Sequence, residues 1–86
     1  MTIFILYIWS LYAVNNLIME IFAKRLRELR NERELSIYDM GKVLGIAHNS
    51  YLRYEQDTSE PTQKNLVKLA QFFGVTTDYL LGLADI

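Results

Sequence analysis

The sequence contains no cysteine and only one histidine in its 86 residues. Without cysteine, neither a disulfide nor a thiolate metal site can form. A single histidine is also too few for the usual imidazole sites of zinc or iron. We therefore expect no metal and no cofactor. The absence of cysteine is compatible with the reducing cytoplasm, where we expect the protein to reside.

The residue sets that enzymes need are also missing. The sequence has no nucleophile with a matching base and no glycine-rich loop of the kind that binds phosphates. The acidic residues Asp39, Asp57 and Glu60 are better interpreted as helix caps and loop charges than as a catalytic cluster. These absences predict that the protein is not an enzyme.

The chain also lacks the basic excess that is typical of nucleic-acid-binding proteins, since it has nine Lys and Arg against ten Asp and Glu. The charges are unevenly distributed: residues 1–19 carry none, and residues 20–86 carry all nineteen. We therefore divide the chain into an apolar N-terminal extension, residues 1–19, and a domain, residues 20–86. The domain is long enough to form one hydrophobic core.

Four interpretations of the apolar extension stay open at this point. A signal peptide is disfavoured by the missing basic start and the missing Ala-x-Ala cleavage site. A membrane anchor needs about 20 apolar residues, whereas the apolar stretch 3–14 has twelve residues and ends at Asn15. The segment could instead pack on the domain, on a second copy or on another partner, as a helix or, by β-propensity, as a strand. Finally, Met19 could be the first residue of the natural protein. If it is not, we expect contact with apolar surface to order the segment.

Helical periodicity dominates residues 20–86, where no segment alternates apolar and polar residues. We predict helices at residues 20–31, 36–44, 48–56, 63–73 and 77–81, and hence an all-α domain. Ser36 is the expected N-cap of the second helix with Asp39 as its capping-box partner, and Gly45 is expected to end that helix. The predicted inward-facing residues are Ile21, Phe22, Leu26, Leu29, Met40, Leu44, Tyr51, Tyr54, Leu66, Leu69, Ala70 and Phe73.

The second and third helices are short, and only three residues, one of them glycine, separate them. This spacing favours a sharp angle between the helices, which allows the outer face of the third helix to enter the major groove of DNA. Many small helical bundles contain a similar turn. The spacing alone therefore does not distinguish DNA binding from a purely structural role.

The residues add a more specific signal. Residues 35–55 read LSIYDMGKVLGIAHNSYLRYE, Pro61 follows in a loop, and residues 66–82 read LVKLAQFFGVTTDYLLG. In this combination they resemble the XRE family, the Cro- and phage-repressor-like helix-turn-helix proteins, over residues 22–83. The resemblance implies a five-helix lambda-repressor-like DNA-binding domain. It also implies a transcription regulator that binds double-stranded DNA as a homodimer.

The resemblance further implies which residues act on DNA. It makes residues 48–56 the recognition helix, where Asn suits adenine and Arg suits guanine. The expected DNA-contacting set is His48, Asn49, Arg53, Ser36 and Ser50. The resemblance also pairs Arg30 of the first helix with Glu55, and such a pair would fix the orientation of the recognition helix.

Several positions depart from the family pattern. They are Glu34 for glycine, Ile37 for glutamine, Gly41 for alanine, Ala47 for a capping Ser or Thr, and the acidic loop 56–61 for a basic one. Because Asp57 and Glu60 would repel phosphate, we expect weak binding by a monomer, or binding that depends on a dimer or partner. The alternative function is a protein-interaction or membrane-tethered helix-turn-helix module with weak DNA binding. Ile37, Tyr38, Val43 and Leu52 are also candidates for a surface that docks the apolar extension or a partner, the other interpretation being scattered exposed apolar residues of the ordinary kind.

Overall fold

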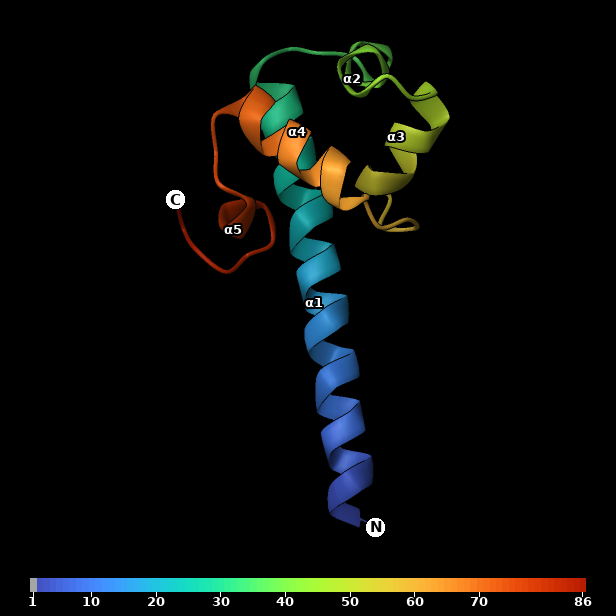
Figure 1. Cartoon of the computed structure of the whole chain (residues 1–86), viewed down its shortest axis with the longest axis vertical. Helices are drawn as coiled ribbons and strands as arrows, with labels where there is room; N and C mark the ends of the chain where they lie inside the picture. The colour runs from blue at the N-terminus through green and yellow to red at the C-terminus, as the bar shows by residue number, and fades with distance from the viewer. Residues whose placement is uncertain (1) are drawn as a thin grey trace.

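The computed structural model describes the backbone of residues 2–86 and the side chains of Leu6 and residues 16–86. This part of the chain forms five helices and no strand, so the all-α prediction is confirmed (Figure 1). The helices are α1 (Thr2–Glu32), α2 (Ile37–Leu44), α3 (His48–Glu55), α4 (Gln63–Phe73) and α5 (Thr77–Leu80). The predicted bounds of the last four helices agree with these to within one residue.

The first helix is much longer than predicted, and it includes the apolar extension. The prediction began this helix at Glu20, whereas α1 begins at Thr2 and continues without a break to Glu32. The interpretation of the extension as a strand is therefore wrong. A lone strand leaves its backbone N–H and C=O groups without partners, whereas a helix satisfies them within the segment.

The N-terminal half of α1 extends away from the other four helices (Figure 1). The side chains of Leu6 and Leu17 are 64% and 55% exposed. Contact with the core begins further along, where Met19 packs against it and Phe22 is fully buried. The two leucines therefore lack the expected contact with apolar surface of their own domain. Among the residues described, no helix is both long and apolar enough to cross a membrane.

The hydrophobic core lies where the C-terminal half of α1 meets α3 and α5, with α2 packed on α3 and α4, and α4 packed on α5. Its buried residues are Phe22, Leu26, Met40, Leu44, Tyr51, Tyr54, Leu69, Ala70, Phe73 and Leu80. Three residues that were predicted to face inward, Ile21, Leu29 and Leu66, are only half-buried. Full burial of one large apolar side chain contributes about 1.5–3 kcal/mol, so this cluster is the main source of stability.

The helix ends follow the predicted local signals. Ser36 Oγ accepts a hydrogen bond from the Asp39 N–H at 3.0 Å, and Asp39 Oδ2 accepts one from the Ser36 N–H at 2.8 Å. These two bonds form the expected capping box, and the bond from the Ser36 N–H is the main cause that lowers the pKa of Asp39. Gly45 ends α2 with a φ of 69°, in the left-handed region where glycine is favoured.

Two non-glycine residues also adopt the left-handed conformation. Glu34, between α1 and α2, has a φ of 56°, and Asp57, just after α3, has a φ of 60°. A side chain with a Cβ costs about 1–2 kcal/mol in this region, although Asp tolerates it better than most residues. The family glycine that Glu34 replaces would fit this backbone without strain.

Two arginines of α1 hold the C-terminal helices in place. Arg25 stacks on the Tyr79 ring and donates hydrogen bonds to the backbone carbonyls of Tyr79 and Ala84. Arg33 donates to the carbonyls of Phe72 and Phe73 at 2.8 and 3.0 Å. These carbonyls end α4, where the helix dipole favours a cation. The sequence gives no local signal for such contacts, because they join residues that are far apart in the chain.

Candidate nucleic-acid interface

The helix-turn-helix consists of α2, the turn at residues 45–47 and α3, and Gly41 sets how closely the two helices pack. A Cβ at Gly41 would lie 2.9 Å from the Ile46 carbonyl oxygen and 3.2 Å from the Cα of His48. Glycine therefore allows the turn and the start of α3 to approach α2 more closely than the alanine of the family pattern. This packing explains why the position is glycine, although glycine in a helix costs about 1 kcal/mol relative to alanine.

One face of α3 is fixed in the core, and the opposite face is open. Tyr51 and Tyr54 are buried, whereas Asn49, Ser50 and Arg53 are exposed. Arg53 neighbours both Asn49 and Ser50 on the helix surface, because it follows them by four and three residues. Three of the residues predicted to contact DNA therefore lie together on the free face of a short helix. As predicted, Ala47 at the N-cap position gives α3 no side-chain hydrogen bond.

Glu55, at the end of α3, meets Arg30 of α1 in a two-pronged ion pair. Arg30 Nε donates to Glu55 Oε2 at 2.7 Å and Arg30 Nη2 donates to Oε1 at 3.0 Å. A third donor, Nη1, reaches the Leu35 carbonyl at 2.9 Å. The side chains of Arg30 and Glu55 are only 15% and 4% exposed. The structure thus brings together the two residues that the sequence paired, and they tie α3 to α1.

The ion pair also affects the pKa values of Arg30 and of the neighbouring Tyr51. The hydrogen bond with Glu55 is the main cause that raises the pKa of Arg30. Burial raises the pKa of the neighbouring Tyr51, and Glu55 raises it further. Arg30 therefore stays charged and Tyr51 neutral at physiological pH.

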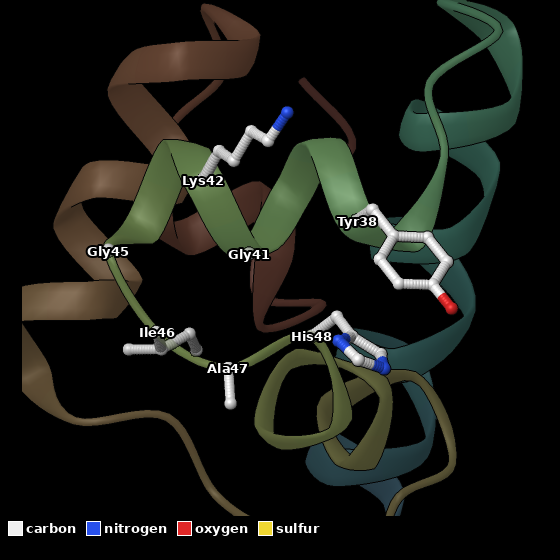
Figure 2. A pocket seen from close by; sticks show the side chains of 7 residues that line it. All are labelled: Tyr38, Gly41, Lys42, Gly45, Ile46, Ala47 and His48. Atoms are coloured by element: carbon white, nitrogen blue, oxygen red, sulfur yellow. The ribbon is translucent and has the colours of Figure 1, made fainter.

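His48, the first residue of α3, packs against Tyr38 of α2 (Figure 2). The ring centroids are 4.3 Å apart and the planes are inclined by 35°. Tyr38 is 64% exposed, so the pair lies on the surface rather than in the core. A shallow groove beside it is lined by Tyr38, Gly41, Lys42, Gly45, Ile46, Ala47 and His48. The sequence assigned His48 to DNA but gave no sign of this pairing.

The other residues of the suggested docking surface do not meet the apolar extension. Ile37, Val43 and Leu52 are half-buried. Figure 1 places α2 at the end of the domain opposite to the N-terminus of α1, so the extension does not cover this surface. Ser36, the remaining residue of the predicted DNA-contacting set, is exposed at the start of α2, where its oxygen serves the capping box.

Fewer basic side chains are available for phosphate than the composition suggests. Arg25, Arg30 and Arg33 are engaged with groups of the domain itself. The exposed basic residues on α2, α3 and the start of α4 are Lys42, Arg53 and Lys64. Lys24 and Arg27 of α1 are also exposed, beside the end of α3. Two acidic residues, Asp57 and Glu60, are exposed in the loop between Arg53 and Lys64. This distribution gives the open face of α3 few cations for phosphate binding.

Comparison with known proteins identifies the family. The profile of the helix-turn-helix family matches residues 26–80, and the chain therefore belongs to this family. The match confirms the XRE resemblance that the residues suggested. The matched range begins on α1 and ends at the last residue of α5, so it covers all five helices except the start of α1.

Curated relatives and one solved structure agree with this membership. The chain is 39% identical over 64 residues to the uncharacterized HTH-type transcriptional regulator YobD of Bacillus subtilis, covering 74% of this chain and 57% of that protein. It is 39% identical over 54 residues to the cryptic phage CTXphi transcriptional repressor RstR of Vibrio cholerae, covering 63% and 49%. The chain thus spans about half the length of the curated relatives it matches. The P22 c2 repressor protein, crystallised with a synthetic operator, superimposes with a TM-score of 0.69 at 25% identity, covering 73% of this chain and 96% of that chain.

Proposed function

We propose that the chain is a sequence-specific DNA-binding transcription regulator that reads the major groove with α3. The observation that carries this proposal is the row of exposed side chains Asn49, Ser50 and Arg53 on a helix held by the core and by the Arg30–Glu55 pair. Base readout by a helix-turn-helix takes only three or four such side chains. Relatives named transcriptional regulators and repressors support the same function, a non-enzymatic role and a location in the cytoplasm.

The chemistry of each exposed side chain assigns its role. Asn49 forms two hydrogen bonds with adenine, and Arg53 forms two with guanine. His48 contacts a base or a phosphate from the first turn of α3. The hydroxyl groups of Ser36 and Ser50 donate to phosphate oxygens, contacts that position a protein on DNA without reading its sequence.

A second part of the proposal is that two copies act as a homodimer on DNA. The few exposed cations and the acidic Asp57 and Glu60 give a single domain little affinity for phosphate. A dimer adds a second α3, which reads the next major groove when the two helices are about 34 Å apart. We assign the contact between copies to the apolar extension, because residues 1–19 carry no charge and Leu6 and Leu17 are exposed.

Selection of bound duplexes from a random DNA pool tests the reading role of α3. The full-length wild-type chain should enrich one motif. Asn49→Ala and Arg53→Ala should each lose preference at one base pair, equivalent to about 1–3 kcal/mol for a two-bond contact. Gln71→Ala is the control, because Gln71 is exposed near the end of α4, which packs on α2 and α5. Failure of the wild type to enrich any motif contradicts the function, and intact motifs in both α3 variants contradict the residue assignment.

Sedimentation equilibrium of the full-length chain tests the homodimer. The wild type should sediment as a dimer, and Leu17→Glu should dissociate it, because a charge then lies in the apolar contact. Leu83→Glu is the control, since Leu83 is also exposed, at 64% against 55% for Leu17, but lies near the other end of the chain. Dissociation by Leu83→Glu alone would place the contact elsewhere. A wild-type monomer would contradict the dimer, and a chain that stays in solution only with detergent would indicate a membrane contact instead.

A further inference from the structure

The Tyr38–His48 pair is a surface contact that the core does not need. The two rings come from different helices, with centroids 4.3 Å apart, and Tyr38 remains 64% exposed. Figure 2 shows the ring of Tyr38 beside the imidazole of His48, whereas Lys42 from the same groove points away from both. A contact with little burial adds little to stability, so its consequence is local: it restricts the orientation of the imidazole.

The backbone is arranged to make this contact possible. Tyr38 lies one helical turn before Gly41, so both residues occupy the same face of α2. The missing side chain at Gly41 lets the His48 backbone approach, since even a Cβ there would lie 3.2 Å from the His48 N and Cα. The His48 ring therefore projects along α2 and over Tyr38. On an open first turn, the same side chain would sample several rotamers.

We propose that Tyr38 is a specificity-determining residue that acts by positioning the His48 imidazole against one base pair of the bound DNA. The inference rests on the proposed function, because it requires that α3 lies in the major groove. Directional hydrogen bonds to base edges discriminate between bases only when the side chain is held in one orientation. The stack on Tyr38 supplies that constraint at the start of α3.

The random-pool selection with variants of the full-length chain tests this role. His48→Ala should flatten the motif at the position that His48 reads. Tyr38→Ala should lower the preference at that same position about two- to ten-fold, the factor that one aromatic pair typically contributes. The double variant should lose no more than His48→Ala alone, and Tyr38→Phe, which keeps the ring, should retain the motif. Lys42→Ala is the matched control from the same groove, and it should weaken binding without changing base preference.

Each contrary result has a distinct meaning. A motif that changes in His48→Ala but not in Tyr38→Ala overturns the inference and leaves the proposed function intact. A motif that Tyr38→Ala weakens evenly at all positions also overturns it, because the residue would then serve only the scaffold. A motif that His48→Ala leaves unchanged overturns it as well, since the imidazole would read nothing. If the wild type enriches no motif, the proposed function fails, and the inference fails with it.

Discussion

Replacement of Arg30 by alanine removes the link between α1 and the helix proposed to read DNA. Glu55 would be left without its counter-charge at a site where its side chain is only 4% exposed. Breaking a buried ion pair on one side costs about 3–5 kcal/mol. Because Arg30 is itself 15% exposed and water can enter the vacated space, we expect the lower end, about 3 kcal/mol. That is a large fraction of the roughly 5–15 kcal/mol that stabilises a typical domain.

Urea denaturation followed by far-UV circular dichroism measures this loss. Arg27→Ala is the matched control: Arg27 is an exposed arginine on the same helix, and the change should stay within about 0.5 kcal/mol of the wild type. In DNA binding, Arg30→Ala should weaken all sequences alike, because Arg30 contacts no base. A loss below about 1 kcal/mol, the value of an exposed pair, would refute the idea that this contact fixes α3.

Four further substitutions test the backbone and the helix ends in the same denaturation assay. Glu34→Gly and Asp57→Gly should each stabilise the domain by about 1 kcal/mol, because glycine has no Cβ penalty at these positive φ values, and a lower urea midpoint would contradict this. Gly41→Ala should destabilise by about 1 kcal/mol, since the clash of its Cβ outweighs the better helix propensity, and a stabilised variant would show that the turn has room. Arg33→Met should cost about 1 kcal/mol through its two lost carbonyl contacts, and an unchanged midpoint would show that they add nothing.

Local signals in the sequence were sufficient for most helix boundaries. Ser36 with Asp39 marked the start of α2, and Gly45 marked its end, because caps and left-handed glycines act over a few residues. The first helix was mispredicted for the opposite reason. Residues 2–19 have no cap and no charged face, and their β-branched and aromatic residues favour strand by propensity, so nothing local fixed the true start of α1.

The candidate site was predictable only in part. The exposed positions of Asn49 and Arg53 and the meeting of Arg30 with Glu55 followed from the family resemblance. The stacking of Tyr38 on His48 did not, because it joins two helices through a close approach that depends on Gly41. Contacts between side chains of separate helices depend on how the helix backbones pack, which local sequence signals do not show.

The Arg25 and Arg33 contacts were missed for a related reason. From the sequence alone, these arginines look like ordinary solvent-exposed charges. In the structure they donate hydrogen bonds to carbonyl groups at the ends of distant segments. Basic residues on the first helix therefore do not by themselves indicate a surface that binds phosphate. Three of them, Arg25, Arg30 and Arg33, make structural contacts within the domain instead.

Sequence-specific binding through α3 is tested most directly by the affinity ratio between the selected duplex and a shuffled duplex of the same composition. Fluorescence anisotropy with the full-length chain at physiological salt provides both dissociation constants. The wild type should prefer the selected duplex by about a thousand-fold or more, and Arg53→Ala should reduce this ratio at least ten-fold. Equal affinity of the wild type for the two duplexes would contradict the assignment of α3 as a reading helix.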